Sequence, residues 1–193
     1  MHALPCSRAA VLARVLARAA VLACAAGLAC AAVGCVETAP LPPPEMAPVE
    51  PSGEPALYAF RTTEGGLFTS ADMHGRFTVI AFVATHDLIS QAQVKVLGLV
   101  QRDHVPRVNV AAVLLGPPEN DPIAVAYGQS LHASFPIGIS DLESVASSRA
   151  FSAVRSVPSV VILDRDGRVV MRHAGAMDEK PLNDELSRLG ARR

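Results

Sequence analysis

Residues 77–93, FTVIAFVATHDLISQAQ, decide the fold because they change from one type of secondary structure to another within a few residues. Residues 77–84 form a continuous run of β-branched, aromatic and small apolar side chains. Such a run is typical of a β-strand that is buried on both faces. The run ends at residues 85–87, and the apolar residues from Leu88 to about Asp103 favour a helix. The sequence therefore predicts a buried strand that leads directly into a helix.

The segments on either side extend this alternation of strands and helices. The other predicted elements are a hairpin at 57–68, a strand at 108–116, helices at 121–135 and 142–151, a strand at 159–164, a hairpin that turns at Asp166-Gly167, and a helix at 178–193. Strands that alternate with helices predict the α/β fold class, with a mixed sheet covered by helices on both faces.

All four cysteines lie near the N-terminus, at Cys6, Cys24, Cys30 and Cys35. Arginines without acidic residues precede an apolar run at 19–34, which is the pattern of a secretory signal. The run is shorter than the roughly 20 residues of a transmembrane helix. We therefore expect residues 1–35 to be a signal segment, with an ordinary cleaved signal or an uncleaved anchor helix as the alternatives.

The end of this segment, AVGC at 32–35, resembles the lipobox of bacterial lipoproteins. The resemblance implies that Cys35 is acylated and tethers the chain to the extracytoplasmic, periplasmic face of a bacterial membrane. Cys24 and Cys30 are rival positions, but Cys24 leaves too short an apolar run. Val36 follows Cys35 where some lipoproteins carry the aspartate that retains them at the inner membrane, so the outer membrane is favoured.

Residues 36–55 contain seven prolines and predict an extended, mobile, polyproline-like linker. A proline-rich ligand for a partner is the alternative interpretation of the same segment. The predicted organisation is therefore a signal segment at 1–35, a linker at 36–55 and one domain at 56–193.

Composition argues against nucleic acid as a partner. The formal net charge is −1, so the chain has no strong positive field. Only 4% of its residues are aromatic and tryptophan is absent, so no stacking platform for single-stranded nucleic acid is expected.

Four segments carry a resemblance to a known family: GGLFTSADMHGRFTVIAFVAT (65–85), VNVAAVLLG (108–116), FPIGISD (135–141) and VRSVPSVVILDRDGRVVMRHAG (154–175). They resemble the thioredoxin-like proteins, and more narrowly the redoxin and TlpA-like, AhpC/TSA-related branch of thiol–disulfide proteins. The resemblance implies a thioredoxin-like fold over roughly residues 56–189. It also implies that Pro158 is a cis-proline facing the active site.

The family's W-C-x-x-C motif falls on residues 86–90 of this chain. Asp87 stands where the first cysteine would be, and Ser90 stands where the second would be. No cysteine follows Cys35, so the domain has no thiolate for disulfide exchange. Asp87 is also an ordinary helix N-cap residue, and Ser90 an ordinary polar residue of a first turn. We therefore expect a relict active site at His86, Asp87 and Ser90, with no catalytic residue and no cofactor.

The resemblance also implies a groove between this turn and the loop of Val157 and Pro158, where relatives hold an extended peptide segment. Such binding does not need a cysteine. The expected function is a binding or scaffold module without thiol–disulfide activity, with an unknown extracytoplasmic protein or peptide as its partner.

Two other functions remain open. The first is an oxidoreductase or antioxidant-family protein that works with external thiols. The second is a metallochaperone, because Thr85-His86 resembles the T-H-C-x-x-x-C motif of the SCO copper chaperones, whose cysteines fall on Asp87 and Gln91. The other histidines lack the spacing of a metal site, so no metal site is predicted.

Overall fold

The computed structural model describes residues 46–48, 53–117 and 121–191. The predicted signal segment and the acylation site at Cys35 lie outside these residues. No helix in the described ranges is long and apolar enough to cross a membrane.

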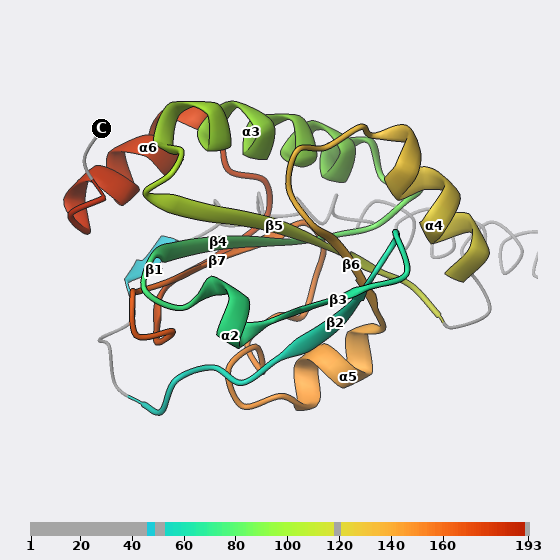
Figure 1. Cartoon of the computed structure of the whole chain (residues 1–193), viewed down its shortest axis with the longest axis horizontal. Helices are drawn as coiled ribbons and strands as arrows, with labels where there is room; N and C mark the ends of the chain where they lie inside the picture. The colour runs from blue at the N-terminus through green and yellow to red at the C-terminus, as the bar shows by residue number, and fades with distance from the viewer. Residues whose placement is uncertain (1–45, 49–52, 118–120, 192–193) are drawn as a thin grey trace, which may run out of the picture. The chain divides into compact units, whose positions relative to one another are not determined.

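The described residues form one mixed sheet in the order β1-β8-β7-β4-β5-β6-β2-β3 (Figure 1). The strands are β1 (Met46–Pro48), β2 (Ala59–Thr62), β3 (Leu67–Thr69), β4 (Phe77–Val83), β5 (Val108–Leu115), β6 (Ile137–Ser140), β7 (Ser159–Leu163) and β8 (Val169–Ala174). Central strand β4 pairs in parallel with β5 and antiparallel with β7, and β6 pairs in parallel with β5. The predicted hairpins are present as β2–β3 and β7–β8.

Helices lie on both faces of this sheet, as the sequence predicts. They are α2 (Ser70–Met73), α3 (Leu88–His104), α4 (Asp121–Ser130), α5 (Leu142–Ser147) and α6 (Glu179–Arg188). In Figure 1, α3 and α6 lie above the sheet and α5 lies below it. Together with the mixed sheet, this arrangement confirms the predicted α/β fold class.

Every residue of β4 is buried, because alternate side chains enter two separate cores. Val79, Ala81 and Val83 pack into the core beneath α3 and α6. Ile80 and Phe82 pack into the opposite core, which is rich in aromatic rings. The continuous apolar run in the sequence follows from this burial on both faces.

The sequence pattern does not predict β6 or the single turn of α2. Strand β6 has only four residues, and one of them is Gly138, a residue type that is depleted in strands. A Cβ atom at Gly138 would lie 2.6 Å from a ring carbon of Phe68 and 2.8 Å from Cβ of Phe60. Close packing therefore requires glycine at this position. Because glycine is not typical of strands, the sequence pattern does not indicate a strand here.

Strand β1 lies inside the segment predicted as an extended linker. Its main chain pairs with β8, with Ala47 opposite Arg172. Further along, the backbone N–H of Ala56 donates to the carbonyl of Gly167 at 2.8 Å. Proline is tolerated at the edge of a sheet, where its missing N–H faces no partner strand, so proline-rich composition did not prevent this pairing. The sheet thus begins inside the segment predicted as a linker.

Candidate functional site: a cleft at the end of the central strands

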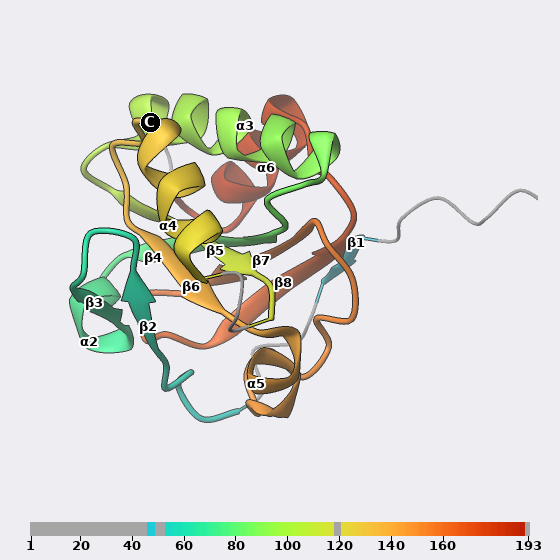
Figure 2. The ribbon, with the colours of Figure 1, turned by 90° about the vertical axis from the view of Figure 1, so that its right-hand side faces the viewer.

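A cleft of about 970 Å³ lies where β4 and β5 end. Figure 2 looks onto this end of the sheet, with α4 above and α5 below. The lining comes from four parts of the chain: Ala84 and His86 after β4, Leu115 to Pro117 after β5, residues 141–144 and Ser147 at α5, and Arg155 to Val157 before β7. Because these parts are far apart in the sequence, only the fold brings them together.

Asp87 caps the helix that starts beside this cleft. Its carboxylate accepts hydrogen bonds from the backbone N–H groups of Ile89 at 3.2 Å and Ser90 at 2.9 Å. These are among the N–H groups that have no partner within the helix itself. The predicted N-cap role of Asp87 is therefore confirmed by the geometry.

Ser90 has a larger structural role than that of an ordinary first-turn residue. It is fully buried, and its hydroxyl donates to Oδ2 of Asp87 at 2.7 Å. The same hydroxyl oxygen accepts the backbone N–H of Ala84 at 3.1 Å. Ser90 thus ties the end of β4 to the start of α3, and its hydroxyl is not exposed for attack on a substrate.

The hydrogen bond from the Ser90 hydroxyl holds the pKa of Asp87 below its usual value. The backbone N–H groups of Ser90 and Ile89 and the charge of His86 act in the same direction, while partial burial opposes them. The ionised form of Asp87 is thus the form that the folded state favours.

A lowered folded-state pKa predicts a pH-dependent difference between the unchanged chain and Asp87→Asn. The stabilising contribution of Asp87 is fully present above its unfolded pKa of about 3.9, and is lost as pH falls through the lower folded value. Chemical denaturation should therefore show a higher free energy of unfolding for the unchanged protein than for Asp87→Asn at pH 7, and this difference should decrease below about pH 4. A difference that stays constant from pH 7 to about pH 3 would contradict the lowered pKa of Asp87.

The predicted groove is present only in part. His86 and Val157 both line the cleft, and the Val157-Pro158 peptide bond is cis, as the resemblance implies. Pro158 itself is buried. However, Asp87 and Ser90 are not among the lining residues, because their side chains are bonded to the start of α3.

The opposite wall of the cleft is α5, which sequence reasoning did not identify as part of a site. Asp141 caps this helix, accepting the backbone N–H of Ser144 at 2.7 Å and its hydroxyl at 2.6 Å. The Ser144 hydroxyl lowers the pKa of Asp141 in the same way that Ser90 lowers that of Asp87. The repeated Asp-x-x-Ser spacing is the signal in the sequence that could have identified this wall.

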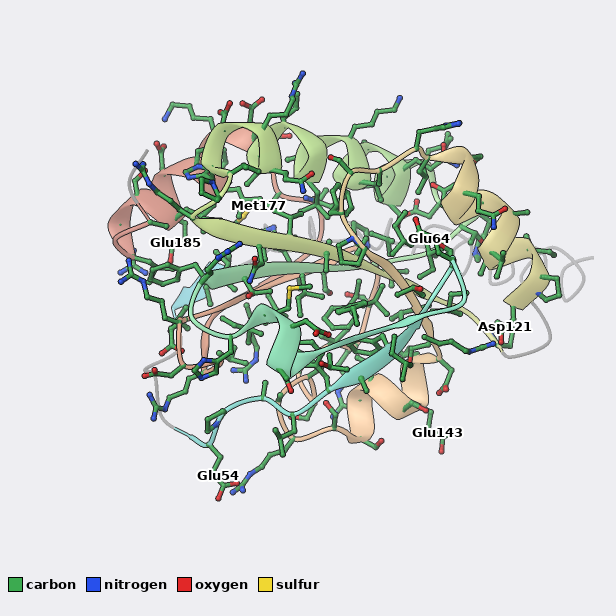
Figure 3. The ribbon with its side chains drawn as sticks, viewed as in Figure 1. Glu54, Glu64, Asp121, Glu143, Met177 and Glu185 are labelled. Atoms are coloured by element: carbon green, nitrogen blue, oxygen red, sulfur yellow. The ribbon has the colours of Figure 1, made fainter. Side chains whose placement is uncertain are left out.

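The lining of the cleft combines apolar and charged side chains. Its floor includes the apolar side chains of Ala84, Leu115 and Val157, and its rim carries Glu143 and Arg155. Figure 3 shows Glu143 on the outer side of α5. An apolar floor with a charged rim is the usual composition of a protein or peptide binding surface.

No metal centre accompanies the cleft in the part of the chain that the structure describes. No group of three or more His, Cys, Asp or Glu side chains lies close enough there to hold a metal ion. His86 lines the cleft without such a group around it.

Comparison with known proteins gives the fold but no family. No protein-family model matches the chain, and no curated protein matches it. Solved structures do match. A DsbF homologue from Corynebacterium diphtheriae has a TM-score of 0.64 at 11% identity, over 74% of this chain and 92% of that one.

Two further structures agree. A thioredoxin-family thiol:disulfide interchange protein from Chlorobium tepidum has a TM-score of 0.61 at 17% identity, over 76% of this chain and all of that one. The exposed lipoprotein thioredoxin Etrx1 from Streptococcus pneumoniae has a TM-score of 0.58 at 18% identity, over 69% and 99% of the two chains. The predicted thioredoxin-like fold is therefore confirmed. Identities this low carry no information on activity.

Proposed function

We propose that this chain is an extracytoplasmic, membrane-tethered binding or scaffold module with a thioredoxin-like fold and no thiol–disulfide activity of its own. The observation that carries the proposal is the start of α3, where Asp87 and Ser90 complete a hydrogen-bonded cap. Thiol–disulfide exchange requires a thiolate, and no cysteine follows Cys35. The junction of β4 and α3 is kept, but it carries no cysteine that could perform disulfide exchange.

The cleft supports the proposed binding role because it could hold an extended peptide. An extended peptide would lie across Val157 and His86 with α5 as its second wall, and main-chain hydrogen bonds would supply part of the affinity. The apolar side chains of Leu88 and Leu142, which are 78% and 42% exposed, begin the two helices beside the cleft. They add apolar area that a partner would cover.

The proposed location rests on the N-terminal sequence and on the neighbours of the fold. The signal-like segment and the lipobox-like AVGC at 32–35 support a lipid tether at Cys35. The structures with a similar fold include one named as an exposed lipoprotein and one named as a secreted isomerase.

A thiol–disulfide oxidoreductase is the second candidate, because the structures that share this fold are named as thiol–disulfide proteins. It would have to take both thiols from other molecules. An insulin-reduction assay on the full chain separates the two candidates. We expect a rate equal to that of the reductant alone, and a rate clearly above it would contradict the proposal.

The binding role is tested by cross-linking the full chain in its native membranes and quantifying partners by mass spectrometry. The variant is Val157→Arg, which puts charge and bulk into the cleft. It is preferable to a change at Asp87, because Asp87 also caps α3. The matched control is Val105→Arg, at a valine that also precedes a proline but is 60% exposed and outside the cleft.

We expect Val157→Arg to lose a partner that Val105→Arg keeps, with a loss of about tenfold or more in recovery, since disrupting a hot-spot contact costs about 2 kcal/mol or more. Equal recovery of all partners by the two variants would show that the cleft is not the binding surface.

A further inference from the structure

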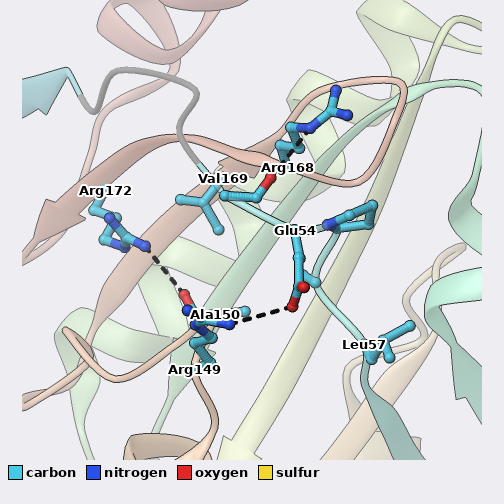
Figure 4. A pocket seen from close by; sticks show the side chains of 10 residues that line it. Glu54, Leu57, Arg149, Ala150, Arg168, Val169 and Arg172 are labelled. Carbon is cyan, nitrogen blue, oxygen red and sulfur yellow. Dashed lines mark hydrogen bonds and ion pairs between the residues drawn. The ribbon is translucent and has the colours of Figure 1, made fainter.

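A second pocket lies away from the cleft and shares no lining residue with it. Its walls are residues 53–57, Arg149 with Ala150, and the three residues Arg168, Val169 and Arg172 around the start of β8. We call it the arginine pocket. Figure 4 shows Arg168 and Arg172 on one side, Arg149 on the other and Glu54 between them.

The three arginines are paired to different extents. Arg149 forms an ion pair with Glu54 at 3.2 Å, and both side chains are more than 80% exposed. Arg168 donates from Nη1 to Asp166 at 2.7 Å and from Nε to the carbonyl of Gly53 at 3.2 Å. Three cationic side chains therefore line the pocket against the single carboxylate of Glu54.

Arg172 is the cation with the least compensation. Its Nη2 donates to the carbonyl of Ala150 at 3.3 Å, and within the described residues it has no carboxylate in ion-pairing distance. Its Nε is buried and has no hydrogen-bond partner there. Burial also lowers the pKa of Arg172, because it disfavours the charged form. A buried donor on an uncompensated cation is costly, and an anion would offset that cost.

We propose that the arginine pocket binds a phosphate group, either as inorganic phosphate or as the head group of an anionic lipid. Guanidinium groups that approach from different segments suit an anion with several acceptor oxygens. The pocket volume of about 220 Å³ is several times the roughly 30 Å³ that a water molecule takes in the liquid, so a tetrahedral anion fits.

Glu54 marks the place that such an anion would take. Its carboxylate lines the pocket, and an exposed ion pair with Arg149 holds it there. Exposed ion pairs contribute little to stability, so a dianion can displace this one at low cost. Glu54 is therefore a competitor of the ligand, and removing its charge should strengthen phosphate binding.

The test is calorimetric titration of the full chain with inorganic phosphate at constant ionic strength. Arg172→Gln should weaken binding about tenfold, because a charge-assisted hydrogen bond is lost. Glu54→Gln should tighten binding. The control Arg102→Gln removes an exposed arginine of α3, makes the same change in net charge as Arg172→Gln, and should leave affinity unchanged. The exposure of Glu54 makes its variant safe for the fold, so the test survives if Arg172→Gln unfolds.

A second arm distinguishes the two sources of phosphate. Co-sedimentation compares vesicles of phosphatidylcholine alone with vesicles that also contain phosphatidylglycerol, so that any lipid anchor contributes equally to both. Binding of inorganic phosphate with the stated order of variants identifies a free anion as the ligand. If the same order of affinities among the variants appears only in the extra binding that phosphatidylglycerol adds, the ligand is a lipid head group. No binding in either arm, or equal affinities for all variants, overturns the proposal.

Discussion

Replacing both Asp87 and Ser90 with cysteine is expected to give thiol–disulfide activity to residues 56–193, which contain no cysteine. The two side chains already meet, with 2.7 Å between Oδ2 of Asp87 and Oγ of Ser90. A cysteine sulfur at position 87 would stand at the place of Cγ, one bond nearer the backbone than Oδ2, so a disulfide of about 2 Å needs side-chain rotation at these positions. The sulfur at position 87 would sit at the N-terminus of a 17-residue helix, which stabilises a thiolate.

The size of the effect follows from the thiolate fraction. A thiol pKa lowered from about 8.5 to about 7 raises the thiolate fraction at pH 7 from about 3% to about half, which is more than tenfold. The lower pKa also reduces the intrinsic reactivity of the thiolate about fivefold, so we expect insulin reduction by the double variant at about three times the rate of an ordinary dithiol, and formation of an internal disulfide in air. The unchanged chain, with its four N-terminal cysteines, gives the baseline.

The matched control is the pair Asp141→Cys and Ser144→Cys on α5. That pair has the same spacing and the same hydrogen bonds, at 2.7 and 2.6 Å, but it starts a helix of only six residues. We expect it to behave as an ordinary dithiol. If the two double variants have equal activity, or if the pair on α3 forms its disulfide and remains inactive, the start of α3 is not a relict thiol site.

Phe82→Ala is expected to cause the largest loss of stability among single changes in the sheet. Phe82 is fully buried in β4, and its ring meets the ring of Phe151 edge-on at 5.1 Å between centroids. Removing a buried phenylalanine ring costs about 3–5 kcal/mol, from lost transfer free energy and the cavity left behind. A domain of ordinary stability, about 5–15 kcal/mol, would lose a large share of it.

Chemical denaturation of both chains measures this loss. Leu88→Ala is the control, because Leu88 is 78% exposed and its removal should change the free energy of unfolding by less than about 0.5 kcal/mol. A cost below about 1 kcal/mol for Phe82→Ala would show that the aromatic core is not packed as described.

Features that depend on neighbouring residues were predictable from the sequence, and features that depend on contacts between distant segments were not. Strand β4 was predictable because burial on both faces leaves a continuous apolar run. The cap at Asp87 was predictable because capping acts within three residues. Strand β1 and strand β6 were not predictable, since each has only three or four residues and is held by its neighbours β8, β5 and β2.

The sequence by itself determined the α/β layout and the lack of any cysteine after Cys35, which depend on local patterns and on residue identity. The thioredoxin-like fold and the cis-proline at Pro158 were implied by the family resemblance. Only the tertiary structure decided that α5 forms the second wall of the cleft, that Ser90 is buried, and that Arg149, Arg168 and Arg172 line one pocket. These residues are brought together by packing between segments that are far apart in the chain. Local sequence periodicity does not show which of these segments will be in contact.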